Sequence, residues 1–178
     1  MKAKIPYKEG LDLADRIKEE LSPWCDEIEI AGSLRRKKPT IGDIEIVCIP
    51  KRQMNLFGEP DASLLDMHLY SLLSDGRLLQ GDKNGDNYKN FYIPALPELK
   101  LDLFITNPEC WPVIFAIRTG SANFSRRLVT QKNKGGLLPS EYNVSKGRVW
   151  DRGIPLDLSS ERNFLELCGG WVEPEERL

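Results

Sequence analysis

The sequence predicts an α+β fold, because helical and strand-like segments both occur along a chain of 178 residues. Apolar residues recur at helical spacing near the start, at Leu11, Ala14, Ile17 and Leu21. Apolar or alternating runs over 41–49 and 99–105 are typical of strands. Folding a chain of this length buries roughly 70% of the unfolded surface, which is enough for one compact domain or two small subdomains sharing a core.

In the first half, charged residues separate the apolar positions of the first helix, and Ser22-Pro23 ends it. Pro50, Gly58 and Pro60 mark a loop before the second helix. The predicted elements are, in order, a helix over 8–22, a strand over 28–31, a glycine-serine turn over 32–36, a strand over 41–49, a loop over 50–61 and a helix over 62–73.

In the second half, Asn84-Gly85 is a hairpin turn signal and Asn107-Pro108 is a helix start. A change to basic composition near 117–119 suggests a boundary between a domain over 1–117 and a subdomain over 118–178. The predicted elements are hairpin strands over 77–80 and 90–93, a strand over 99–105, a helix from 107 to about 118, a basic helix over 122–134, a small sheet within 137–149 and a short helix begun by Ser159 or Ser160.

The formal net charge of −2 conceals an uneven distribution. Residues 118–152 carry eight basic and two acidic side chains, a net charge of +6 that leaves −8 for the rest. The apolar runs are far shorter than the ~20 residues of a membrane-spanning helix, and the first residues lack a signal-peptide core. We therefore expect an intracellular, soluble protein with no membrane partner.

Four cysteines, Cys25, Cys48, Cys110 and Cys168, form no C-x-x-C pair, and the chain has a single histidine. Zinc sites usually take their ligands from closely spaced pairs, so a zinc site is not expected. Cys48 lies in an apolar strand and is interpreted as a small core residue.

Two carboxylates lie inside the strand over 41–49. Side chains two apart in a strand share a face, so Asp43 and Glu45 project together with Cα atoms about 7 Å apart, while Ile44 and Ile46 point into the core. Asp102 is the polar-face residue of the other strand. If the two strands are neighbours, three carboxylates meet on one patch, where Mg²⁺ is the natural ion to neutralise them.

For the D-x-E pair alone, the ordinary alternative is that these residues face solvent on the wet side of an antiparallel sheet. The glycine-serine turn with two arginines, 11 residues upstream, favours a functional interpretation. Such a turn can bind a triphosphate through backbone N–H groups, a hydroxyl and guanidinium groups.

Five segments in order resemble the DNA polymerase X family, the polymerase beta-like branch of the nucleotidyltransferases. They are Gly32-Ser33-Leu34-Arg35-Arg36, Gly42-Asp43-Ile44-Glu45, Lys100-Leu101-Asp102-Leu103-Phe104, Thr119-Gly120-Ser121-Ala122-Asn123-Phe124-Ser125-Arg126, and a C-terminal signature from Ser160 to Leu167 that closes with Pro174-Glu175-Glu176-Arg177. The resemblance implies a nucleotidyltransferase palm with a mixed β-sheet and flanking helices, followed by a small C-terminal α/β subdomain.

The resemblance also implies roles for single residues. Asp43, Glu45 and Asp102 match the catalytic, metal-binding carboxylates of a site for two Mg²⁺ ions, with Mn²⁺ possible. The other matched positions bind the nucleotide: Gly32, Ser33 and Arg36 at the triphosphate, Gly42 before the first carboxylate, and Gly120 and Ser121 beneath the sugar and base.

The sequence departs from the family at four positions. Glu45 stands where the family usually has aspartate. Ile117 and Arg118 replace an aromatic pair that packs on the nucleotide sugar, and Ser125 replaces an asparagine-like minor-groove contact. Too few residues precede Gly32 for the helix-hairpin-helix and lyase domains of larger members, so lyase activity is not expected. DNA contacts are expected from Arg126, Arg127, Lys132 and Lys134.

The expected function is addition of dNMP from a dNTP to a DNA 3′-hydroxyl with release of pyrophosphate, by a monomer acting on primer-template or gapped DNA in short-gap repair. A template-independent terminal transferase acting on single-stranded DNA or RNA ends is the first alternative. The second is a non-enzymatic nucleic-acid-binding module.

Overall fold

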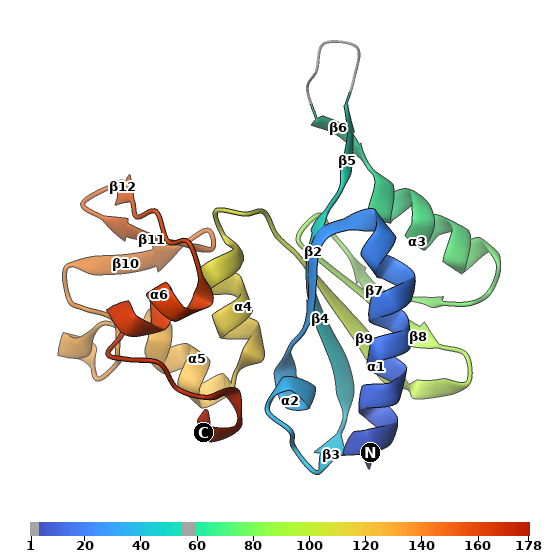
Figure 1. The fold of residues 1–178 in the computed structure, drawn as a ribbon, viewed down its shortest axis with the longest axis horizontal. Coiled ribbons are helices and arrows are strands. Elements are labelled where there is room, and N and C mark those ends of the chain that lie inside the picture. Colours follow the sequence, from blue (N-terminus) through green and yellow to red (C-terminus); the bar gives the residue numbers. More distant parts are fainter. Residues whose placement is uncertain (1–3, 55–59) are drawn as a thin grey trace. The chain divides into compact units, whose positions relative to one another are not determined.

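The computed structural model describes residues 4–54 and 60–178 and confirms the predicted α+β class (Figure 1). The chain forms two compact units. The first unit combines Met1–Ile30 with Pro39–Thr106, and the second combines Ala31–Lys38 with Asn107–Leu178. The chain therefore leaves the first unit for eight residues before it returns.

A five-stranded mixed sheet forms the centre of the first unit. Its strand order is β2 (Cys25–Ile30), β4 (Asp43–Pro50), β9 (Leu96–Ile105), β8 (Tyr88–Ile93) and β7 (Leu79–Asn84). The two middle strands β4 and β9 run parallel, and every other pair is antiparallel. As a result, β4 and β9, which are far apart in sequence, both start at the same end of the sheet.

Helices α1 (Tyr7–Leu21) and α3 (Leu64–Ser74) pack on one face of this sheet. Ile44, Ile46, Leu101 and Leu103 point toward them and are fully buried, as the alternation predicts. Polar residues of the same strands occupy the opposite face. Three short elements complete the first part of this unit: β1 (Ile5–Pro6), which pairs with β3 (Thr40–Ile41), and the 3₁₀ turn η1 (Ser22–Trp24).

The predicted loop over 50–61 is wrong in part. Strand β5 (Arg52–Met54) pairs with β6 (Pro60–Ser63) in a two-stranded ribbon, and 55–59 lie outside the described residues. The prolines did not exclude a strand because Pro50 is the last residue of β4 and Pro60 is the first of β6, positions where the missing N–H is tolerated.

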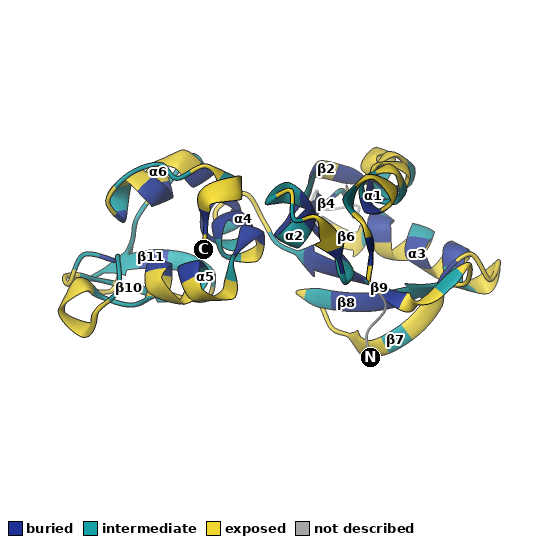
Figure 2. Ribbon diagram, turned by 90° about the horizontal axis from the view of Figure 1, so that it is seen from below, coloured by how far each residue is buried: buried dark blue, intermediate teal, exposed yellow. Residues whose placement is uncertain are grey.

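The second unit has its own hydrophobic core (Figure 2). Val113, Phe124, Leu128, Val149 and Phe164 bring together residues from three helices and a strand. Its elements are α2 (Gly32–Arg35), α4 (Trp111–Thr119), α5 (Ala122–Val129), the 3₁₀ turn η2 (Lys132–Lys134), the antiparallel sheet β10 (Tyr142–Ser145), β11 (Arg148–Asp151) and β12 (Ile154–Pro155), α6 (Glu161–Leu167) and the 3₁₀ turn η3 (Pro174–Glu176).

The boundary between the two compact units differs from the predicted boundary at 117/118. The division falls between Thr106 and Asn107, because Val113 and Ala116 of α4 are buried in the core formed with α5 and α6. The segment 31–38 also belongs to the second unit. Composition could not reveal this arrangement, because α4 is apolar and the basic residues begin only at its end.

Candidate functional site

The predicted site residues fall into both units. Asp43, Glu45, Asp102 and Gly42 belong to the first unit, and all the others belong to the second. Each group is described in its own unit.

The parallel pairing of β4 with β9 brings the predicted carboxylates onto one face of the sheet. Glu45 is registered directly opposite Asp102, and Asp43 is opposite Lys100. Registered partners on neighbouring strands point to the same side, so all three carboxylates share the face opposite α1 and α3. The three carboxylates were predicted to lie on one patch if the two strands were neighbours, and β4 and β9 are neighbours.

Asp102 is held by two polar side chains. It is only 6% exposed, and each of its carboxylate oxygens has a partner. The Tyr88 hydroxyl donates to Oδ1 at 2.7 Å, and the Lys100 ammonium lies 3.0 Å from Oδ2. Sequence reasoning missed both partners, although the alternation that placed Asp102 on the polar face places Lys100 there as well.

The carboxylate affects the ionisation of both partners. Burial is the largest influence on the Lys100 pKa and lowers it, but the hydrogen bond and charge of Asp102 together leave this pKa above its ordinary value. Burial raises the pKa of Tyr88, and the hydrogen bond to Asp102 raises it further. Both side chains are therefore held in their protonated forms against a buried negative charge.

The donor set fits a hard cation such as Mg²⁺, which takes carboxylate oxygens and leaves positions for water and phosphate. Among the described residues, no group of three or more His, Cys, Asp or Glu side chains is already arranged to hold a metal ion. The hydrogen bonds of Asp102 account for part of this, because a cation at Oδ2 would compete with the Lys100 ammonium.

Gly42 precedes the first carboxylate. A Cβ at this position would meet no atom of the described residues within 4 Å, apart from its chain neighbours, so packing against them does not require glycine there.

In the second unit, the glycine-serine turn forms the single helical turn α2. Gly32 has a φ of 60°, a conformation that favours glycine. The Ser33 hydroxyl oxygen is buried and has no hydrogen-bond partner among the described residues. Buried hydroxyls are nearly always paired, so an orphaned one is a candidate ligand contact.

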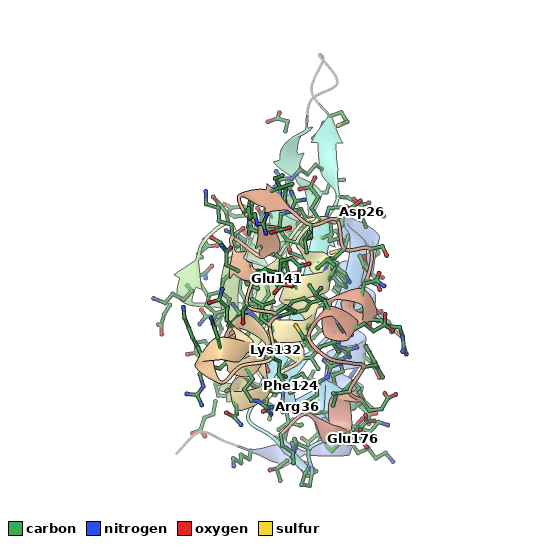
Figure 3. The ribbon with its side chains drawn as sticks, turned by 90° about the vertical axis from the view of Figure 1, so that its left-hand side faces the viewer. Asp26, Arg36, Phe124, Lys132, Glu141 and Glu176 are labelled. Carbon is green, nitrogen blue, oxygen red and sulfur yellow. The ribbon has the colours of Figure 1, made fainter. Side chains whose placement is uncertain are left out.

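Arg36 connects α2 to the turn that ends α4 (Figure 3 labels Arg36). Its guanidinium donates to the carbonyl oxygen of Thr119. Gly120 follows with a φ of 75°, and a Cβ on it would lie 2.5 Å from Arg36 Nη1. The structure therefore brings together two of the predicted nucleotide-binding segments, 32–36 and 120–121, which are distant in sequence.

A buried ion-pair network fixes the same turn from the C-terminal side. The Arg35 guanidinium forms a bidentate pair with Glu161, at 2.8 and 2.6 Å, and also donates to the Thr119 hydroxyl. Arg177, which is fully buried, contributes a second guanidinium 2.7 Å from Glu161. Sequence reasoning did not find this network, because 126 residues separate Arg35 from Glu161 and nothing in the sequence pairs them.

The two arginines determine the charge state of Glu161. Burial, the largest single influence, raises the pKa of this carboxyl, but the hydrogen bonds and charges of Arg35 and Arg177 more than offset it. Its pKa therefore lies below the ordinary value, and Glu161 stays ionised inside the unit.

The remaining predicted nucleotide contacts surround the start of α5. The Ser121 hydroxyl caps this helix by accepting from the Phe124 N–H at 3.2 Å. The Ser125 hydroxyl donates to the Ile117 carbonyl at 2.6 Å, so it could take part in a further contact only as an acceptor unless this internal hydrogen bond broke. Ile117 packs against the core, whereas Arg118 is exposed.

The predicted DNA-binding side chains lie on the exposed face of α5 and on η2. Arg126 and Arg127 lie opposite the buried Phe124 and Leu128, and Figure 2 shows this division of α5. Lys132, labelled in Figure 3, and Lys134 extend the exposed basic set. Within the described part of the chain, none of the salt bridges involves Arg127, Lys132 or Lys134.

Over the described ranges, no helix is both long and apolar enough to cross a membrane. A comparison with protein-family models found no match to this chain, and a comparison with curated protein sequences found none either.

Proposed function

We propose that this protein is a metal-dependent nucleotidyltransferase of the polymerase X type, which adds dNMP from a dNTP to a DNA 3′-hydroxyl and releases pyrophosphate. The observation that carries the proposal is the register of β4 and β9, which sets Glu45 beside Asp102 with Asp43 on the same face. Half-exposed strands often carry one solvent-facing carboxylate. Three carboxylates on one face of adjoining parallel strands favour the binding of a cation, in addition to the Lys100 ammonium that already faces Asp102.

In this proposal the three carboxylates hold two Mg²⁺ ions. Bound there, the ions would supply the positive charge that activates a hydroxyl and stabilises a leaving phosphate oxygen. Asp102 is the residue best placed to orient the primer 3′-hydroxyl, because Tyr88 and Lys100 fix its carboxylate plane from two sides. Glu45 has the longer side chain and would reach further from β4 than aspartate does.

The second unit would bind the triphosphate. The buried Ser33 hydroxyl supplies a hydrogen-bonding group that has no partner among the residues that the structure describes. Arg36, positioned by Thr119, supplies a guanidinium that can bind phosphate oxygens in a bidentate manner. Gly120 supports the same role, because any side chain there would displace Arg36.

DNA would be held through phosphates by the basic side chains of α5 and η2. Contacts of this kind position a duplex or single strand without reading its sequence. They also explain how a chain with a formal charge of −2 can bind a polyanion.

A template-independent terminal transferase, acting on single-stranded DNA or RNA ends, is the second candidate. The observation that favours it is at the end of α4, where Ile117 turns into the core and Arg118 is exposed. In this proposal, neither position provides an aromatic surface for packing against a nucleotide sugar.

One experiment separates the candidates. Wild-type protein is incubated with gapped, nicked, primed and single-stranded substrates, each with the four dNTPs or the four rNTPs, in Mg²⁺ and in Mn²⁺. Templated addition of dNMP to gapped or primed DNA is the expected result. Equal addition of any nucleotide to single strands would favour the terminal transferase.

A binding module would give a third result. Salt-sensitive binding to DNA without any nucleotide addition, in either metal and on every substrate, would overturn the proposed activity. The DNA-binding part of the proposal would then stand alone.

A further inference from the structure

Two cysteines of the first unit lie on neighbouring strands. Ile28 of β2 is registered opposite Cys48 of β4, and Cys25 is opposite Pro50. Cys25 and Cys48 are therefore diagonal neighbours, and both point to the face that α1 and α3 cover. The bulge between Cys25 and Glu27 lies in this stretch, where it alters the local path of β2.

Both thiols are enclosed by the same elements. Cys48 is fully buried, and Cys25 is 5% exposed at the first position of β2. The residue before Cys25 is Trp24, whose ring stacks on the imidazole of His68 from α3 at 4.9 Å. The end of β4 is also close, because the Lys51 N–H donates to the Trp24 carbonyl at 2.9 Å and the Lys51 ammonium donates to the Pro23 carbonyl.

The two thiols influence each other directly. A hydrogen bond with the Cys48 thiol lowers the pKa of Cys25, burial opposes this, and the Lys51 charge lowers the pKa again. The same hydrogen bond and burial raise the pKa of Cys48. Of the two, Cys25 is thus the side chain that ionises first, and it is also the one nearer the surface.

We propose that Cys25 and Cys48 are a redox-sensitive pair that forms an intramolecular disulfide in the presence of a peroxide. The register that makes them diagonal neighbours places the two side chains on the same face of paired strands, which is the arrangement from which a disulfide can form. The other two cysteines belong to the second unit, and Cys168 is buried there.

The chemistry proceeds in two balanced steps with hydrogen peroxide as the oxidant. The Cys25 thiolate attacks one peroxide oxygen, the O–O bond breaks, and a sulfenic acid and hydroxide form, with the hydroxide taking up a proton to give water. The Cys48 sulfur then attacks the sulfenic sulfur, the S–O bond breaks, and water leaves with the thiol proton. Overall, two thiols lose two electrons to one peroxide, which becomes two waters.

The experiment uses the full chain, since both compact units are then present. Reduced protein is treated with hydrogen peroxide, remaining thiols are blocked with an alkylating reagent under denaturing conditions, and peptides are mapped by mass spectrometry. The Cys110→Ser variant is the matched control, because it removes the partly exposed thiol of the second unit. The Cys48→Ala variant removes the resolving thiol.

The expected product is a peptide pair joined through Cys25 and Cys48, lighter by two hydrogen atoms than the two thiol peptides and released by dithiothreitol. It should form in wild-type protein and in Cys110→Ser, and be absent from Cys48→Ala. Alkylated Cys25 and Cys48 in wild-type protein, after treatment that oxidises Cys110, would overturn the proposal. So would a cross-link from Cys25 to another chain. The wild-type map decides the question even if Cys48→Ala fails to fold.

Discussion

Asp102 is held between side chains from two strands, Tyr88 of β8 and Lys100 of β9. Its position on the polar face follows from alternation alone, and so does that of Lys100. Tyr88 could not be predicted, because its approach depends on the antiparallel register that pairs β8 with β9. At the residue scale, the sequence therefore predicts which groups point to the site, and the register determines which of them touch.

The tyrosine contact has a measurable consequence. The Tyr88 pKa is raised above its ordinary value of 10.0 by burial and by the hydrogen bond to Asp102. Subtracting the phenolate absorbance titration of Tyr88→Phe from that of wild-type protein should therefore give a midpoint above pH 10. The Asp102→Asn variant should lower this midpoint, because the negative charge that opposes phenolate formation is removed.

The same shift contributes to stability with a definite sign. The folded state binds the Tyr88 and Lys100 protons more tightly than the unfolded state, so their contribution to stability is fully present below about pH 10 and is lost as the pH rises through the raised pKa values.

In the absorbance experiment, a midpoint of the wild-type minus Tyr88→Phe titration at or below pH 10 would show that Tyr88 does not donate to Asp102.

Gly120 gives a second test at the residue scale. Its φ of 75° favours glycine, and a Cβ would approach Arg36 Nη1 to 2.5 Å. Gly120→Ala should therefore destabilise the protein by about 1–3 kcal/mol and weaken dNTP binding measured by calorimetry.

Gly135→Ala is the matched control for this variant. Gly135 also has a positive φ, 83°, but a Cβ there would meet no atom within 4 Å in the described ranges 4–54 and 60–178. It should cost stability and leave dNTP affinity unchanged. Equal dNTP affinity in both variants would remove the argument that Gly120 makes room for Arg36.

At the scale of elements, the sequence was most informative where contacts between residues close in the chain determine the structure. The helix predicted over 8–22 is α1 (Tyr7–Leu21), and the Ser160 side chain caps α6 by accepting from the Asn163 N–H. The hairpin predicted around Asn84-Gly85 is also present, because the Gly85 N–H donates to the Tyr88 carbonyl. These features depend on contacts within a few residues.

The predicted bounds of helices and strands were wrong where contacts outside the element determine its ends. The helix predicted from Asn107 starts at Trp111, because Asn107 instead closes a turn by accepting from the Cys110 N–H. The basic helix predicted to reach Lys134 ends at Val129, since the Thr130 and Arg127 carbonyls accept from the Leu138 and Leu137 N–H groups. The sheet predicted within 137–149 lies over 142–155, because β12 adds to its edge.

The network that joins α2, α6 and the C-terminal segment gives an element-scale prediction. Glu161→Gln leaves the buried Arg177 without its anionic partner, which typically costs 3–5 kcal/mol, so we expect a loss of about that size in urea unfolding. Because the Glu161 pKa is lowered in the folded state, its stabilising contribution is present above its ordinary pKa and is lost as the pH falls below it.

Glu166→Gln is the control, since this exposed side chain of the same helix pairs with Arg162 at 4.0 Å. An exposed pair of this kind contributes at most about 1 kcal/mol. If Glu161→Gln and Glu166→Gln lost the same stability, the network could not be the structural link that the geometry indicates.

At the scale of the whole molecule, the two units carry different charge. The carboxylates on the polar sheet face belong to the first unit, and the basic side chains of α5 and η2 belong to the second. The formal charge of −2 is therefore the sum of an acidic unit and a basic unit. The sequence revealed this separation, but it could not reveal that 31–38 joins the basic unit.

DNA affinity should fall steeply with salt if the basic set binds phosphates. In a plot of log affinity against log salt, replacing both Lys132 and Lys134 by glutamine should reduce the slope by about 2, one for each lost phosphate contact. Lys8→Gln, which changes an exposed lysine of α1 in the first unit, should leave the slope unchanged. A slope unaffected by the double substitution would place the DNA contacts elsewhere.

The most direct test of the proposed catalytic site is the rate of dNMP incorporation into gapped DNA by the Asp43→Asn variant in Mg²⁺. Asp86→Asn, in the exposed turn between β7 and β8, is the matched control. We expect Asp43→Asn to remain folded and to lose about 10²-fold or more of the rate, because a metal ligand is removed, while Asp86→Asn keeps the wild-type rate. Incorporation by Asp43→Asn at the wild-type rate would contradict the assignment of the carboxylates on β4 and β9 as the catalytic site.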